Sequence, residues 1–208
     1  MGWIRSGLGC LSWIGAAVII VLLLLKVILF DVALMEHNGM APTLVHGERV
    51  LINKRGEPVH GSIAVCKHPT EEGWVVGRVA ATEGSTIESF RDVLRIDGQP
   101  VRFEERGLTD FYNEDKDVKS SVVWGNEVSG SDNHQIFFNQ NRQHLVRKTA
   151  VEPGKLYLLG DYRGYMGQDS RTYGLVDAAS CRGTIVFRLI PVEGLEPEIS
   201  HEYFELVQ

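Results

Sequence analysis

The sequence predicts a mainly β domain that follows one N-terminal transmembrane helix. Two observations support this prediction. A nearly continuous apolar run occupies residues 11–30, and short β-rich runs separated by turn residues make up most of the remaining chain. With 208 residues, of which 44% are hydrophobic, the chain is long enough for one membrane anchor and one well-cored domain.

The apolar run reads LSWIGAAVIIVLLLLKVILF from residue 11 to residue 30. At a helical rise of 1.5 Å per residue, about 20 residues cross a hydrocarbon core about 30 Å thick. A cleavable signal peptide is the alternative, but its apolar region would span only about 7–15 residues and end at small residues. The residues from Asp31 to Met35 offer no such site. Lys26 lies near the far end of the run, where its ammonium group can reach the interface.

Residues 1–10 are therefore expected to form a short cytoplasmic N-terminus, and residues 31–208 an extracytoplasmic domain. Arg5 and the amino terminus favour a cytoplasmic start, while the acidic Asp31 and Glu36 follow the span. This orientation places the bulk of the chain in the periplasm, held to the bacterial inner membrane by a single pass. The lipid bilayer is then one partner of the chain.

The β-rich runs follow one another along the outer domain. Predicted strands cover residues 49–53, 62–66, 74–79, 86–90, 93–96, 155–159 and 183–189. Asp97-Gly98, after one of these runs, is a strong hairpin-turn signal. Residues 109–147 are polar with scattered aromatics, and we expect a long insertion in the form of a hairpin and no second domain. The acidic tail, residues 191–208, is expected to pack on the domain or to dock on a partner.

The net charge and the histidine spacing limit which partners and ligands the chain can bind. The net charge of −6 argues against nucleic acid, because phosphate binding needs a basic face. We predict no cofactor and no metal, since the seven histidines lack zinc-ligand spacing and His134 falls in a predicted polar loop.

Cys10 borders the membrane, so Cys66 and Cys181 are the only plausible disulfide pair. Because Cys66 lies in a strand-like run, a buried free thiol is the expected state and a disulfide the alternative.

Five short motifs occur in a fixed order after the apolar run. They are Met40-Ala41-Pro42-Thr43-Leu44, then Gly47-Glu48-Arg49-Val50-Leu51-Ile52, then Gly61-Ser62-Ile63-Ala64-Val65-Cys66-Lys67-His68-Pro69, then Gly77-Arg78-Val79-Ala80-Ala81-Thr82-Glu83-Gly84-Ser85, and finally Gly160-Asp161-Tyr162-Arg163 with Asp169-Ser170-Arg171 and Gly174. In this order the motifs resemble those of the bacterial type I signal peptidases, also called leader peptidases. The resemblance covers most of the chain and implies a signal-peptidase-like coiled β-sheet domain tethered by one N-terminal transmembrane helix.

Active members of that family are serine proteases with a Ser-Lys dyad. The resemblance places the nucleophile at Gly39, the general base at Gly77, and an oxyanion-hole hydroxyl at His37. Since a glycine has no side chain to attack a carbonyl carbon, the resemblance implies that the dyad is absent and that no catalytic residue remains. The two glycines also remove bulk, so the cleft is expected to be either wider or filled by Tyr162 or Tyr165. The other matched residues are expected to be structural: Met40, Pro42, Thr43, Arg78, Asp161, Arg163, Asp169 and Arg171.

The leading hypothesis is a catalytically inactive signal-peptidase-like membrane protein. It would hold an extended segment of a membrane or exported protein, or act as an accessory or assembly subunit of an envelope complex, because adding a strand to a sheet edge needs no nucleophile. The alternative is an active signal peptidase I-type serine endopeptidase that processes signal peptides through a non-standard arrangement. The groups available for that arrangement are His37, Ser62, Lys67 and Ser170.

Overall fold

The structure is a computed structural model that describes residues 13, 15–21, 26, 28–113, 117–130, 132–140, 145–193 and 201–207. Within these ranges no helix is long and apolar enough to cross a membrane. The predicted N-terminus, residues 1–10, lies outside the described residues, and so do residues 11, 12, 14, 22–25 and 27 of the predicted anchor, residues 11–30. Phe30, the last residue of the predicted anchor, is the first residue of strand β1.

The described part of the chain consists mainly of β-strands, which confirms the mainly β part of the predicted fold class. The strands are β1 (Phe30–Leu34), β2 (Arg49–Asn53), β3 (Ile63–Lys67), β4 (Trp74–Thr82), β5 (Thr86–Phe90), β6 (Val93–Ile96), β7 (Gln99–Pro100), β8 (Arg102–Asn113), β9 (Val118–Ser129), β10 (Asp132–Phe138), β11 (Thr149–Ala150), β12 (Lys155–Leu159), β13 (Val176–Asp177), β14 (Cys181–Ile190) and β15 (Glu205–Leu206). Short helical turns join them: η1 (Asn38–Met40), α2 (Ser170–Tyr173) and η2 (Ala178–Ser180).

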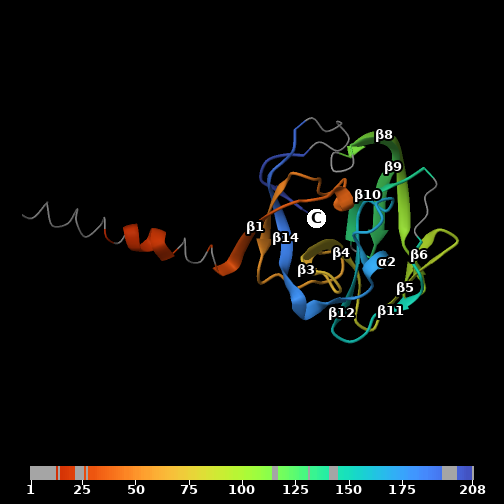
Figure 1. Cartoon of the computed structure of the whole chain (residues 1–208), viewed down its shortest axis with the longest axis horizontal. Helices are drawn as coiled ribbons and strands as arrows, with labels where there is room; N and C mark the ends of the chain where they lie inside the picture. The colour runs from red at the N-terminus through yellow and green to blue at the C-terminus, as the bar shows by residue number, and fades with distance from the viewer. Residues whose placement is uncertain are drawn as a thin grey trace, which may run out of the picture.

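The largest sheet has the strand order β1-β2-β14-β3-β4-β12-β13, with β15 paired to β14. Every neighbouring pair from β1 to β4 is antiparallel, so β1 and β4, which are separated by three strands, run in the same direction. In Figure 1, β1, β14 and β3 lie on one side of the domain and the long strands β8 and β9 on the other.

Two smaller sheets complete the domain. The first, with the order β10-β9-β8, covers most of the polar stretch at residues 109–147. The second has the order β11-β5-β6-β7, and its β6–β7 turn is the predicted Asp97-Gly98 hairpin, with φ of 52° and 77°. Both residues have the positive φ that a tight hairpin turn requires, and glycine adopts it without strain.

An aromatic cluster attaches β10 to the segment that follows β12. Phe111, Phe137, Tyr162 and Tyr165 are buried together with Ala41 and Val45. The Phe137 N–H donates to the Asp161 carbonyl at 2.9 Å, and the Arg163 N–H donates to the Phe137 carbonyl at 2.7 Å. The three-stranded sheet is therefore fixed to the main sheet beside η1.

Cys66 and Cys181 form a disulfide between β3 and β14. The expected free thiol at Cys66 is therefore wrong, because the register of these two neighbouring strands places the cysteines directly opposite each other. The predicted burial of Cys66 is correct. The adjacent strand pairing, and not the local sequence around either cysteine, determines the bond.

The described end of the tail, residues 201–207, packs on the domain. Residues of β15 pair with β14, where Phe187 faces Leu206. His201 Nδ1 lies 2.6 Å from the buried Glu48 Oε1, and Arg188 contacts both Glu48 and Glu205. Of the two expectations for the tail, packing on the domain describes these residues.

Candidate functional site

A groove of about 420 Å³ lies across one face of the main sheet. It is lined by residues 32–37, by Trp74 and Val76 of β4, and by side chains of the strands between them, namely Val50, Val65, Arg182 and Ile185. Because β1 and β4 are separated by three strands and yet line one cavity, the sheet must be curled into a half-barrel. The lining is largely apolar, as is usual for a site that binds a ligand through shape and backbone contacts.

Two strand edges with unused backbone groups face this groove. Among the described strands, β1 pairs only with β2, which leaves its other edge open. Residues 74–77 of β4 pair with β3, and the pairing of β4 with β12 begins only at Arg78. Each open edge carries a row of backbone N–H and C=O groups that an added strand can bond. The groove is therefore suited to an extended peptide.

The two ends of the groove differ in character. At the start of β1 and β4, the Arg182 guanidinium lies 4.6 Å from the centre of the Trp74 ring. Its Nη1 atom lies 3.5 Å from Asp31 Oδ2, and this ion pair is partly exposed. At the other end the groove reaches His37, which immediately precedes η1. A peptide lying along β1 would thus run from a charged, aromatic end to the turn that contains Gly39.

The His37 ring occupies the space beside Gly39. His37 caps η1, and its Nδ1 atom accepts a hydrogen bond from the Gly39 N–H at 3.0 Å. A Cβ atom added at Gly39 would lie 2.9 Å from that same Nδ1 atom and 3.4 Å from Gln168 Cβ. The His37 ring in turn stacks on Tyr165, with 6.0 Å between ring centres. A side chain at position 39 would require the His37 ring to move.

Leu158 fills the space beside Gly77 in the same way. A Cβ atom added at Gly77 would lie 2.9 Å from Leu158 Cβ and 3.4 Å from the Leu159 carbonyl oxygen. The same segment, residues 158–162, also contacts the other glycine, since the Tyr162 N–H donates to the Gly39 carbonyl at 3.1 Å. Both glycines are thus packed against residues 158–162, and neither has open space for a reactive side chain.

A buried ion pair holds this segment against β4. Arg78 donates from Nε to Asp161 Oδ1 at 2.9 Å and from Nη2 to Oδ2 at 2.7 Å. Thr43 Oγ1 donates to Asp161 Oδ2 at 2.5 Å, and Arg78 Nη1 donates to the Gly61 carbonyl at 2.8 Å. Burial opposes the charge on Asp161, but Arg78, His134 and Thr43 hold the pKa of its carboxyl below the usual range. This bidentate ion pair fixes the position of the loop that follows β12.

His134 extends the buried polar cluster onto β10. Its Nδ1 atom lies 3.0 Å from Asp132 Oδ2, and its Nε2 atom lies 3.5 Å from Glu127 Oε1 and 3.7 Å from Asp161 Oδ1. Glu127 also accepts from Arg163 Nη2 at 2.5 Å. Burial opposes the charge on His134, but the surrounding carboxylates raise the pKa of His134 above its usual value. A protonated His134 balances the charge of the cluster.

Comparison with known proteins identifies the family of the chain. The family described as "Signal peptidase, peptidase S26" matches residues 9–190. Signal peptidase I T of Bacillus subtilis is 37% identical over 188 residues, which cover 87% of this chain and 86% of that protein. Signal peptidase IB of Staphylococcus aureus strain N315 is 30% identical over 158 residues, 74% of each chain. The chain belongs to the signal peptidase I family.

A solved signal peptidase I from Enterococcus faecalis is also similar to this family member. It is 24% identical, covers 61% of this chain and 95% of its own, and has a TM-score of 0.37. The mainly β fold with a curled half-barrel sheet follows from the strand order and the groove described above.

The matched residues of this signal peptidase I family member form two adjoining polar clusters. Thr43, Arg78 and Asp161 form the first. In the second, Arg171 Nη2 lies 2.7 Å from Asp169 Oδ2, and Asp169 also caps α2. Arg171 Nη1 donates to the Arg163 carbonyl at 2.7 Å, which joins the two clusters through the loop. Met40 belongs to the apolar core, and Pro42 follows a cis peptide bond.

The groups named for a non-standard catalytic arrangement each have surroundings of their own. Ser62 Oγ donates to the Val59 carbonyl at 2.7 Å, and Ser170 Oγ accepts from the Leu158 N–H at 2.9 Å. Both hydroxyls are thus engaged with backbone groups. Lys67 is an exposed residue at the end of β3, and His37 bonds the Gly39 N–H. His37 and Leu158 fill the space beside the two glycines, and not Tyr162 or Tyr165 as one alternative expected; Tyr165 stacks on His37.

His134 was placed wrongly by its local sequence. It is not in a polar loop but lies buried on β10. Residues 132–135 read Asp-Asn-His-Gln and are all polar, so no apolar alternation marks this part of the strand in the sequence. Within the described ranges, no three His, Cys, Asp or Glu residues are grouped so that they could hold a metal ion.

Proposed function

We propose that this protein binds extended peptide segments in the groove without cleaving them. In this proposal it is an inactive member of the signal peptidase I family, tethered to the bacterial inner membrane by residues 11–30. The bulk of the chain would lie in the periplasm, where it would act as a binding or accessory subunit for a membrane or exported protein.

One observation carries the proposal. The groove ends at the turn that contains Gly39, and both Gly39 and Gly77 are covered by other side chains, namely His37 and Leu158. The apolar lining and the two open, parallel strand edges support binding, because backbone hydrogen bonds supply affinity while shallow pockets select side chains. Covered glycines supply no nucleophile and no base, and removing such a pair typically costs orders of magnitude in rate.

A binding assay with a matched pair of variants tests the proposal. The full chain in detergent micelles is titrated into a fluorescein-labelled decapeptide with an Ala-x-Ala segment, and anisotropy reports binding. Val76→Arg places a charged side chain in the groove and is expected to weaken binding at least about tenfold, which is about 1.4 kcal/mol. Val93→Arg, at the exposed start of β6 and outside the groove lining, is the control and should bind like the wild type.

Mass spectrometry of the same samples shows whether the peptide is intact. Saturable binding with an uncut peptide supports the proposal. Cleavage after the Ala-x-Ala segment that is lost in Val76→Arg would instead favour the active-enzyme alternative. Equal affinity of Val76→Arg and the wild type would show that the peptide does not bind in the groove.

A further inference from the structure

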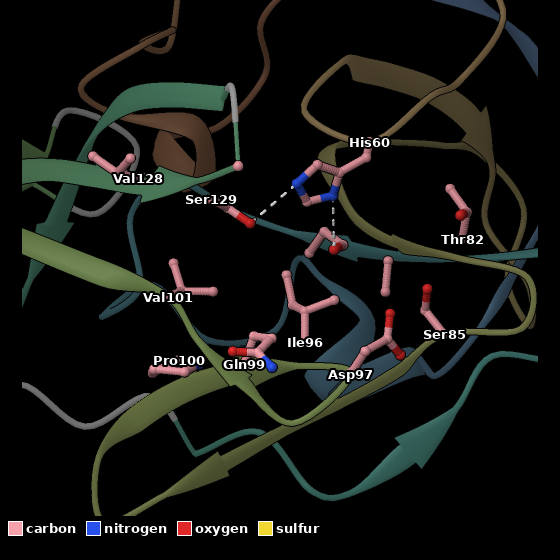
Figure 2. Close-up of a pocket in the computed structure, with 13 residues that line it drawn as sticks. His60, Thr82, Ser85, Ile96, Asp97, Gln99, Pro100, Val101, Val128 and Ser129 are labelled. Carbon is pink, nitrogen blue, oxygen red and sulfur yellow. Dashed lines mark hydrogen bonds between the residues drawn. The ribbon is translucent and has the colours of Figure 1, made fainter.

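A second pocket, of about 280 Å³, is lined by the last residues of β4, whereas the groove is lined by the first, and the two share no lining residue. It is bounded by the end of β4, by the β6–β7 hairpin and by the turn between β9 and β10. Figure 2 shows His60 and Ser129 together on one side of this pocket, with Asp97 and Gln99 on the opposite side.

The His60 ring is fixed by hydrogen bonds at both of its nitrogen atoms. Nδ1 lies 3.1 Å from the Ala80 carbonyl oxygen, and Nε2 lies 3.2 Å from Ser129 Oγ (Figure 2). A carbonyl oxygen can only accept, so Nδ1 must carry the proton. In the neutral ring Nε2 then holds a lone pair, and the Ser129 hydroxyl donates to it. This is the arrangement of a nucleophile, a base and a group that orients the base.

A carboxylate lies close to this histidine. Asp132 is opposite Ser129 in the β9–β10 register, and its side chain occupies the space where a Cβ at Gly61 would lie, at 2.9 Å. Gly61, which follows His60 and has a φ of +84°, therefore lets the carboxylate approach. Asp132 is itself held by His134 at 3.0 Å.

From these contacts we propose that Ser129 is a nucleophile activated by His60, in a site for small polar carboxylic esters. The pocket volume lies near the lower limit for ligand sites and fits a short acyl group. Thr82, Ser85, Asp97 and Gln99 line the pocket and supply hydrogen-bonding groups to a polar alcohol portion. This site is separate from peptide binding in the groove.

The reaction runs in two balanced steps. Ser129 Oγ bonds to the acyl carbon while its proton moves to His60 Nε2, and the ester C–O bond breaks as the leaving alcohol takes that proton. Water then attacks the acyl-serine, giving its proton to His60, which returns it to Ser129 as the carboxylic acid leaves. The orienting bond from Nδ1 to the Ala80 carbonyl persists throughout.

Covalent labelling of the full chain in detergent tests this site. A fluorophosphonate probe is expected to modify Ser129, as peptide mapping by mass spectrometry would show. Ser129→Ala should lose the label. Ser121→Ala, on the same strand and exposed, should keep it. His60→Ala should slow labelling about a hundredfold, the usual contribution of a general base.

Added imidazole separates a chemical role of His60 from a structural one. It should restore at least tenfold of the lost labelling rate in His60→Ala and have no such effect on the wild type. Hydrolysis of p-nitrophenyl acetate should follow the same order across the variants. Absent labelling of the folded wild type, labelling at another residue, or an unchanged rate in His60→Ala would overturn the assignment. None of these outcomes bears on peptide binding in the groove.

Discussion

Leu158 and Gly77 are in direct contact across β12 and β4, with Leu158 Cβ only 2.9 Å from the place where a Cβ on Gly77 would lie. Leu158 is fully buried, so it cannot turn out into solvent to admit a larger neighbour. The contact makes glycine a packing requirement at position 77 and excludes a long side chain there without movement of β12.

Substituting Gly77 therefore tests the packing directly. Gly77→Ala should lower the free energy of unfolding by about 1–3 kcal/mol, because it overpacks a well-filled site. In a Leu158→Gly background the same change should cost at least about 1 kcal/mol less, since glycine has no Cβ atom at the point of contact. Urea unfolding of the four proteins in the cycle measures this coupling. Additive effects would mean that Leu158 does not restrict position 77.

Breaking the Arg78–Asp161 pair should be far more costly than breaking a surface pair. Asp161→Ala leaves a buried guanidinium without its carboxylate partner, which should cost about 3–5 kcal/mol in the free energy of unfolding. Asp110→Ala is the control, because Asp110 pairs with Lys119 at 3.2 Å on the exposed β8–β9 ribbon. Its cost should stay below about 1 kcal/mol. Similar losses in both variants would contradict a structural role for Asp161.

His134 should give the domain a pH-dependent stability. Its folded pKa is raised above the usual value of about 6.5, so the folded state binds the proton more tightly than the unfolded state. The stabilisation is complete below about pH 6.5 and is lost as pH rises through the folded pKa. Asp132 and Asp161 have lowered pKa values despite burial, so their contribution is lost as pH falls below about 3.9.

Chemical denaturation between pH 4 and pH 9 measures this dependence. The wild type should lose stability on the alkaline side, and His134→Gln should lose most of that slope. Asp132→Asn removes the partner of His134 Nδ1 and should reduce the slope without abolishing it. A slope that survives intact in His134→Gln would assign the effect to another group.

The disulfide should account for a measurable part of the stability. The bond joins residues 115 positions apart, and a crosslink over a loop of that size typically contributes about 2–5 kcal/mol. Cys66→Ala combined with Cys181→Ala should lower the unfolding free energy by that amount, while Cys10→Ala should not. A thiol assay in denaturant should find one free thiol before reduction and three afterwards, the full cysteine content. Three thiols before reduction would exclude the bond.

The local pattern of the sequence was enough to predict several strands. The runs at 49–53, 86–90 and 93–96 match β2, β5 and β6, because alternating residues and a strong Asp97-Gly98 turn act over short distances. Local alternation of residues did not predict the strands in the long polar stretch at residues 109–147. Residues 109–147 were expected to form an insertion in the form of a hairpin, with His134 in a polar loop, yet His134 lies on β10, and β9 and β10 contribute to the aromatic cluster.

Contacts between distant residues could not be derived in the same way. The bond between Cys66 and Cys181 depends on β3 and β14 being neighbours, and the pairing of Glu127 with Arg163 depends on how β10 attaches to the loop after β12. The sequence close to these residues does not indicate which strands become neighbours. The structural role of Arg78 and Asp161 was expected only through the family resemblance. The space beside Gly77 is filled by Leu158, which is far away in the sequence.

Hydrogen exchange on the peptide complex tests most directly whether the groove holds a strand that stays uncut. The full chain in detergent is saturated with the Ala-x-Ala decapeptide, and backbone amide protection is measured with and without peptide. We expect new protection at residues 31–34 and 74–77 that is lost in Val76→Arg, together with recovery of the intact peptide. Peptide recovered as two fragments, or protection confined to other strands, would contradict it.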